Sequence, residues 1–137
     1  MPMVRKTFLC VPIFLILSQL ASVASSSGWE LFPIIPGAIE KPCGESEEGI
    51  CREMPVLRLE IRSARKIESL VEELLLLSRK KGWKMVRVTG TREPRYQSTH
   101  GKKFDLLWAV VKTGRSRDLK GREETVYHIF YWKVLGD

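Results

Sequence analysis

Several residue types are scarce or missing. Asparagine is absent from the 137 residues, and glutamine occurs only as Gln19 and Gln97. The chain therefore has no N-glycosylation sequon. Few amides together with many Lys, Arg and Glu form a composition typical of proteins kept at high temperature. The chain also lacks a glycine-rich phosphate loop, a GxSxG nucleophile elbow and an HExxH metal helix. No motif specifies a reaction, and no cofactor is expected.

The charge balance is basic. The chain has 23 Lys and Arg against 16 Asp and Glu, a formal net charge of +7. This excludes an acidic solvating protein and admits anionic partners without selecting one. Hydrophobic residues make up 44% of the chain, which predicts a folded chain of one domain rather than a disordered one.

The N-terminal segment has the pattern of a secretory signal peptide. Arg5 and Lys6 give a positive start, residues 8–17 are uninterrupted apolar, and small residues follow. Roughly 20 helical residues are needed to span a bilayer, so this stretch is short for a membrane helix. We expect cleavage after Ala24 and a secreted or cell-envelope location. The alternatives are an uncleaved membrane anchor and an ordinary core helix.

The cysteines support export. Removal of the signal peptide leaves an even pair, Cys43 and Cys51, which would form a disulfide in an oxidising compartment. The 7 residues between them exceed the roughly two to four of a zinc knuckle, so no metal site is expected. If the protein is not exported, the two thiols would be reduced.

Charge divides the chain after the predicted signal peptide (1–24). An apolar and acidic arm (25–55) holds the cysteines, with 6 acidic against 2 basic residues, and a basic domain (56–137) has 19 basic against 10 acidic residues. The arm either lies against the basic domain or forms a solvated loop, and we favour the solvated loop.

The basic domain has a strand–helix–strand–strand–strand pattern. Residues 56–62 alternate apolar and charged side chains, as in a half-buried strand. Residues 63–81 have an apolar stripe at helical spacing, with Ser63 as the N-cap and Gly82 at the C-terminal end. The further strands are expected at 83–89, 104–113 and 124–135.

These elements predict an α+β fold of order β-α-β-β-β. The helix implies a right-handed crossover between two parallel strands, and the last three strands imply an antiparallel meander. We expect one helix packed on a four-stranded mixed sheet, preceded by the signal peptide and an irregular disulfide-looped arm.

Both faces of the last two predicted strands are apolar and need cover. A helix about 10 Å across is narrower than four strands spaced about 4.8 Å apart. The candidates for additional cover are the arm residues 29–39, a second copy in a homodimer, and a hydrophobic ligand, in that order. We interpret Trp83, Trp108 and Trp132 as packing residues.

Basic residues gather in the two predicted long loops. Such residues with an occasional aromatic suit polymers of phosphate or sulfate, and the alternative is an ordinary solvated loop. For a secreted protein the polymer would be a glycosaminoglycan, an anionic lipid surface or extracellular nucleic acid. The candidate polyanion-binding residues are Lys112, Arg115, Arg117, Lys120 and Arg122, with Arg92, Arg95, Lys102 and Lys103 in the earlier loop.

A catalytic role is the second hypothesis, because small ribonucleases also place a helix before an antiparallel sheet. Phosphodiester cleavage needs a general acid, a general base and a cation. However, His128 alternates onto the same strand face as Phe130 and Trp132, where a packed core histidine is the commoner case. The candidate catalytic residues are His128, His100, Glu123 and Arg122.

The sequence thus predicts a secreted or envelope-associated small binding domain, whose partner is a polyanion or a protein. A small secreted ribonuclease or toxin-like enzyme is the alternative, and a membrane-anchored accessory domain is the third.

Overall fold

The computed structural model describes residues 29–98 and 104–134. The chain divides into two compact units, Met1–Phe32 and Pro33–Asp137. The described residues of the first unit form a short 3-10 helix, η1 (Trp29–Leu31). The predicted signal peptide lies outside the described residues, as do His100, Lys102 and Lys103.

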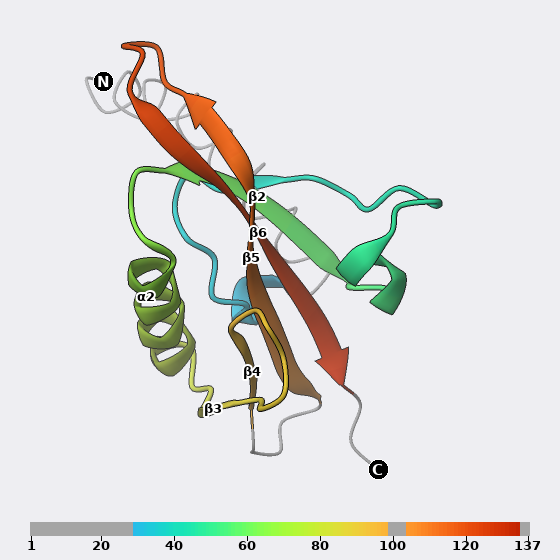
Figure 1. Cartoon of the computed structure of the whole chain (residues 1–137). Coiled ribbons are helices and arrows are strands. Elements are labelled where there is room, and N and C mark those ends of the chain that lie inside the picture. Colours follow the sequence, from blue (N-terminus) through green and yellow to red (C-terminus); the bar gives the residue numbers. More distant parts are fainter. Residues whose placement is uncertain (1–28, 99–103, 135–137) are drawn as a thin grey trace, which may run out of the picture. The chain divides into compact units, whose positions relative to one another are not determined.

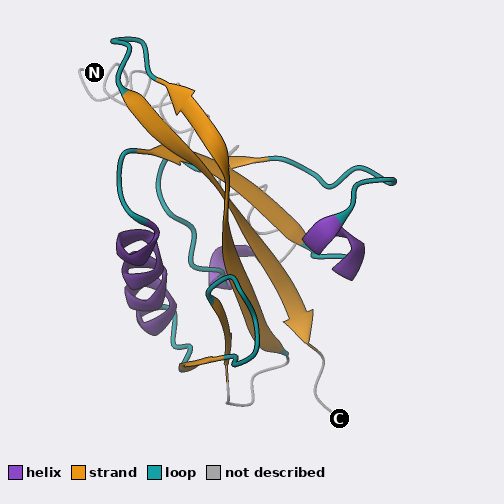
Figure 2. Ribbon diagram, viewed as in Figure 1, coloured by secondary structure: helices purple, strands orange, loops and turns teal. Residues whose placement is uncertain are grey.

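The second unit is built on an antiparallel sheet of six strands (Figure 1; Figure 2). The strand order is β1-β2-β6-β5-β4-β3, and every neighbouring pair is antiparallel. The strands are β1 (Ile39–Glu40), β2 (Leu57–Ser63), β3 (Met85–Arg87), β4 (Arg95–Ser98), β5 (Asp105–Arg117) and β6 (Glu123–Val134).

The predicted four-stranded mixed sheet is therefore wrong; the fold is mostly β. β2 pairs with β6, from Leu57 opposite Tyr131 to Ser63 opposite Thr125, and not with β3. β2 and β3 run in the same direction, but three antiparallel strands lie between them. The helix between β2 and β3 returns the chain so that both strands run in the same direction, but it does not require them to be adjacent in the sheet.

Two short strands were not predicted. β4 forms inside the polar segment expected to be a loop, and it separates β3 from β5. β1 forms in the arm and pairs with β2 through Ile39 and Glu40. Both are too short and too polar or exposed to give an alternating apolar pattern.

The helix α2 (Ile67–Lys80) lies on one face of the sheet, which we call the helix face (Figure 1). Its apolar stripe is buried at Leu70, Val71 and Leu74, as predicted. The Trp108 indole Nε1 donates to Ser78 Oγ at 3.1 Å, which joins the helix to β5. The hydrogen bond thus gives the buried indole N–H an acceptor and the buried hydroxyl a donor.

The helix ends where predicted but begins later. Gly82 has a φ of 89°, the left-handed conformation expected after a helix C-terminus. Ser63 does not cap the helix, because it is the last residue of β2 and its hydroxyl accepts the Arg65 backbone N–H at 3.0 Å. Lys66 occupies the N-cap position instead, without a capping side-chain bond.

The opposite face, which we call the loop face, is covered by the segment 41–54. This segment holds the predicted disulfide Cys43–Cys51, whose Cα atoms are 5.6 Å apart, and the 3-10 helix η2 (Gly49–Glu53). Cys51 packs against the buried side chains of Ala109, Phe130 and Trp132. The cysteine loop therefore serves as cover for the sheet and is not simply a solvated loop.

The arm contributes to the helix face as well. Ile35 is buried, and the Tyr131 hydroxyl donates to the Pro33 carbonyl at 2.7 Å. The three tryptophans interpreted as packing residues, Trp83, Trp108 and Trp132, are all buried.

Candidate functional site

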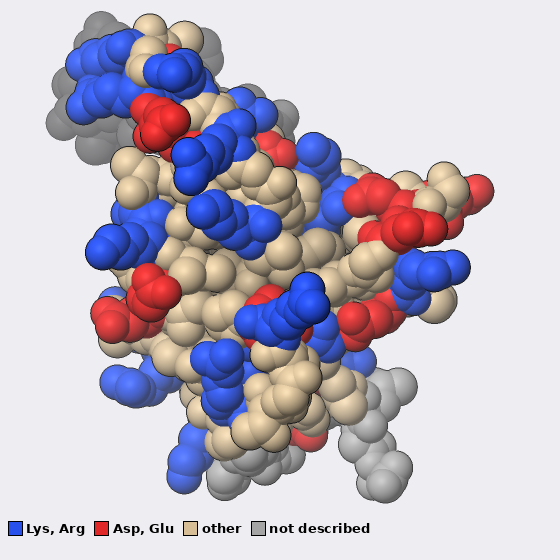
Figure 3. All heavy atoms as spheres, viewed as in Figure 1, with Lys and Arg blue, Asp and Glu red and all other residues tan. Residues whose placement is uncertain are grey.

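The candidate polyanion-binding residues of the second loop lie in one hairpin. β5 and β6 continue beyond the last β2 pair, and a turn over residues 118–122 joins them (Figure 1). The segment 114–117, expected to be loop, is part of β5. Figure 3 shows Lys and Arg gathered over this end of the hairpin. All five candidates, Lys112, Arg115, Arg117, Lys120 and Arg122, are exposed.

An irregularity in β5 places three of these cations on the same face. The register shifts between Lys112 and Gly114, so that Thr113 is an additional residue in β5. Lys112 lies opposite Tyr127, Arg115 opposite Thr125 and Arg117 opposite Glu123. Because residues two apart on β6 share a face, the three cations do too. In a regular strand Arg115 would point to the other face, and such a bulge is a common device for redirecting side chains.

The cations of the hairpin keep most of their exposure. Arg115 pairs with Glu123 at 4.0 Å and Arg122 with Asp118 at 3.5 Å, and both arginine side chains are 70% exposed. Arg117 donates to the Gly121 carbonyl at 2.9 Å. Exposed pairs at such distances contribute little free energy, so a polyanion could displace the carboxylates at low cost.

The first-loop candidates do not join this group. Arg95 bonds both carboxylate oxygens of Glu53 at 2.8 and 3.2 Å and lies over the Trp132 ring. The hydrogen bonds that Arg95 donates to Glu53 raise the pKa of Arg95. Arg95 therefore holds the cysteine loop and is not free to bind a polyanion. Arg92 is exposed and lines a different groove, between α2 and β4.

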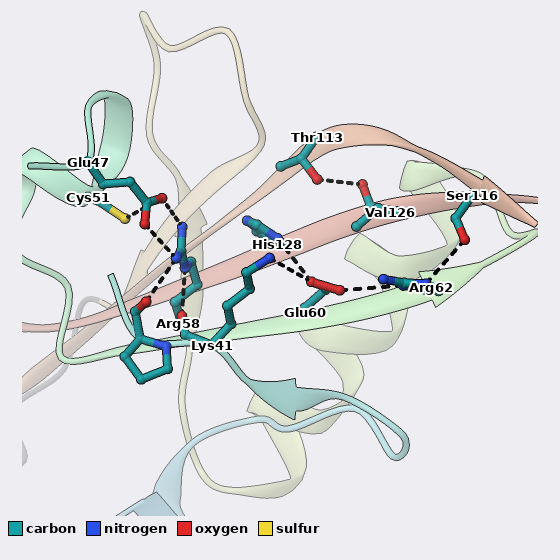
Figure 4. A network of polar contacts seen from close by, with 11 residues as sticks. Lys41, Glu47, Cys51, Arg58, Glu60, Arg62, Thr113, Ser116, Val126 and His128 are labelled. Atoms are coloured by element: carbon teal, nitrogen blue, oxygen red, sulfur yellow. Dashed lines mark hydrogen bonds and ion pairs between the residues drawn. The ribbon is translucent and has the colours of Figure 1, made fainter. Parts of the chain in front are cut away.

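The three candidate catalytic residues that the structure describes, His128, Glu123 and Arg122, are not brought together. His128 and Glu123 are five positions apart along β6, which at about 3.3 Å per residue is roughly 16 Å. Arg122 lies in the turn beyond Glu123. His128 instead belongs to a polar network on the loop face (Figure 4).

In this network His128 lies 3.6 Å from Glu60, and its ring makes an edge contact with Phe130. Burial, with the positive charge of Arg58, lowers the pKa of His128, and the Glu60 carboxylate opposes this shift. Burial of Glu60 opposes its ionisation, but Lys41, Arg62 and His128 outweigh this and lower its pKa. His128 is thus buried and packed, as expected of a core histidine.

Arg58 is the centre of the network's other half. Its side chain is only 4% exposed and donates to the carbonyls of Lys41 and Pro42 at 2.7 and 3.0 Å. It also bonds the Glu47 carboxylate at 2.5 and 3.0 Å (Figure 4). Hydrogen bonds from Arg58 and the Gly44 amide lower the pKa of Glu47 to about 2. This network fixes the cysteine loop on the sheet.

Sequence reasoning missed a groove between α2 and the β3–β4 edge. Its basic lining residues include Arg79, Lys84 and Arg87. Arg79 fits the helix-end pattern, where cations oppose the macrodipole, so no sequence signal marks it as part of a groove. The position of β3 at the sheet edge creates the groove, and that position depends on the strand order that the sequence did not reveal.

Membrane-spanning helices and metal sites can be assessed for the part of the chain that is described. No helix there is both long and apolar enough to cross a bilayer. Across residues 29–98 and 104–134, no three His, Cys, Asp or Glu side chains are grouped to hold a metal ion. Comparison with protein-family models, with curated proteins and with solved structures finds no match to the chain.

Proposed function

We propose that this protein is a small extracytoplasmic binding domain that holds a polyanion on the β5–β6 hairpin. The observation that carries the proposal is the bulge at Thr113, which aligns Lys112, Arg115 and Arg117 on one hairpin face. Arg115 and Arg117 are about 6.6 Å apart along the strand. This row of cations suits a chain of repeated phosphate or sulfate groups better than a single small anion.

The hairpin also favours a polymer because its positive charge is concentrated at one end of the sheet. Residues 112–124 hold five cations and three carboxylates. The acidic residues of the cysteine loop gather elsewhere, as the red spheres in Figure 3 show. A polymer would therefore be drawn to the hairpin and kept from the loop.

The disulfide supports a location outside the cytoplasm. Cys43 and Cys51 are bonded, and such bonds persist in oxidising compartments. Together with the N-terminal pattern, this favours a polymer of the cell surface or the extracellular space.

The salt dependence of binding tests the proposal. We expect heparin and single-stranded oligo(dT) to bind with affinities that fall steeply with salt concentration. Substitution of Lys112, Arg115 and Arg117 by Ser should lower the slope of log K against log salt on oligo(dT) by about 2, because each lost contact contributes roughly 0.7. Fluorescence anisotropy at several salt concentrations measures the slope. Tighter binding of heparin or of oligo(dT) at equal salt distinguishes sulfate from phosphate polymers.

A control variant separates the hairpin from net charge. Substitution of the exposed Arg52, Lys66 and Lys80 by Ser removes the same charge from other surfaces. This variant should keep the wild-type slope. An equal loss of slope in both variants would show that binding follows net charge alone, and the proposal would be wrong.

A further inference from the structure

A second surface lies at the opposite edge of the sheet, on the helix face. Two neighbouring cavities, of about 590 Å³ and about 490 Å³, lie between α2 and β3–β4. Leu75 of the helix and Tyr96 of β4 line both cavities, and Met85 of β3 lines the larger. The groove therefore has an apolar floor with a wall from the helix and a wall from the edge strand.

The strand that borders this groove has an open backbone edge. β3 is the last strand of the described sheet and pairs only with β4. The Val88 N–H donates to the Arg95 carbonyl at 2.8 Å. Backbone groups alternate in direction along a strand, so the N–H and C=O of Val86, two residues earlier, also point toward β4. The N–H and C=O groups of Met85 and Arg87 then point away from the sheet, where another strand could pair with them.

The charges around the groove are mainly positive. Arg79 and Lys84 line the larger cavity with no carboxylate among its lining residues. Arg87 and Arg92 line the smaller cavity with Glu68 and Glu72. Arg87 lies over the Tyr96 ring at 5.7 Å, and the described residues show no ion pair for any of the four cations.

We propose that this groove binds an extended acidic segment of a partner protein, which adds to the sheet as a strand beside β3. The backbone of the segment pairs with Met85 and Arg87, its apolar side chains contact Leu75 and Tyr96, and its carboxylates meet the basic rim. Recognition of this kind takes affinity from main-chain bonds and specificity from the adjoining pockets. An acyl chain could fill the apolar floor, but it would leave the strand edge unpaired.

A short capped peptide of alternating valine and glutamate tests this site. We expect its binding to protect the Met85 and Arg87 amides from hydrogen exchange. Arg79→Glu should weaken binding about tenfold, because it places a like charge beside the carboxylates. Lys80→Glu, the neighbouring exposed residue outside the groove lining, should leave the dissociation constant unchanged. The hairpin serine variant should also bind normally, which keeps this site distinct from the polyanion surface.

Further variants address the backbone pairing itself. Met85→Pro removes one outward N–H and leaves the Val86 and Val88 bonds to β4, so a folded variant should bind more weakly. A valine–lysine peptide and an N-methylated valine–glutamate peptide should not bind. The proposal is overturned if the acidic peptide fails to bind at millimolar concentration, or binds without protecting these amides. It is also overturned if Lys80→Glu weakens binding as much as Arg79→Glu does, or if either control peptide binds equally.

Discussion

Arg58 shows how one buried charge can hold a loop in place. Its guanidinium has acceptors from the Lys41 and Pro42 carbonyls and from Glu47, and it lies 5.9 Å from the centre of the Phe130 ring. The two partners differ in exposure, with the Arg58 side chain at 4% and Glu47 at 44%. Loss of Glu47 leaves a buried cation short of an anion, whereas loss of Arg58 leaves a carboxylate that water can reach.

We therefore predict that Glu47→Gln lowers the urea concentration at the unfolding midpoint at neutral pH. The midpoint of the variant should also change less with pH than that of the wild type. The pKa of Glu47 falls from 4.5 to about 2 on folding, so its contribution to stability is present above about pH 4.5 and is lost as the pH falls toward 2. Wild-type and variant midpoints should differ at about pH 7 and converge near pH 2. Urea unfolding at several pH values measures this.

A neighbour provides the control for this experiment. Glu45→Gln removes an exposed carboxylate from the same loop and should leave both the midpoint and its pH dependence near wild type. If the two variants behave alike, the Arg58–Glu47 bond does not contribute to stability as argued.

Some single-residue roles could be predicted and others could not. Strand alternation predicts that His128 shares a face with Phe130, and the structure shows His128 buried with its ring against Phe130. The sequence places Arg95 among the polyanion-binding candidates, whereas in the structure it forms an ion pair with Glu53, 42 residues earlier in the chain. An ion pair across such a separation depends on strand order, and local sequence does not contain that information.

At the scale of elements, the long periodic segments were predicted well and the short ones were not. α2, β2, β5 and β6 have apolar periodicities that packing then reinforces. β4 is a strand only because β3 and β5 flank it on both sides. The bulge at Thr113 is a matter of register, so the shared face of Lys112 and Arg115 could not be predicted from their spacing.

The cysteine loop is the element whose stability is most open to test. We predict that Cys43→Ala with Cys51→Ala lowers the free energy of unfolding by about 2.5 kcal/mol, the loop-closure entropy for a short loop. The bonded residues are only 8 apart in sequence, so the change should act mainly on this loop. Urea unfolding of the variant and of the reduced wild type measures the loss.

The Trp132 indole reports whether the loop then leaves the sheet. Its Nε1 donates to the Glu53 carbonyl at 3.0 Å, and Glu53 ends η2. Faster exchange of this indole hydrogen in the variant, with unchanged exchange at the Trp108 indole bonded to Ser78, would locate the opening on the loop face. Unchanged protection of Trp132 would contradict the role of the disulfide in holding the cover.

For the whole molecule, the separation of charge follows from how the sheet is covered. The acidic residues of the arm were expected in solvent, yet Glu47 and Glu53 pair with Arg58 and Arg95 of the basic domain. These pairs neutralise two arginines near the middle of the sheet on the loop face. Among the described residues, the cations of the hairpin and of the groove beside α2 have no carboxylate of the arm as a partner, so the two proposed surfaces remain positively charged.

Export is the condition on which the proposed polyanion role depends, and the intact mass tests it. We predict that the natively expressed protein begins at Ser25 and takes up two alkyl groups only after reduction, at Cys43 and Cys51. Cleavage of the segment 1–24 would also remove Cys10, so a third alkyl group would reveal an uncut chain. A full-length product with an intact disulfide would indicate a membrane anchor, and the polymer would then be sought at the membrane surface. A full-length product with free thiols would contradict export, because it would indicate a reducing compartment. The cover of the loop face would then lack its disulfide, and the polymer bound by the hairpin would be an intracellular nucleic acid.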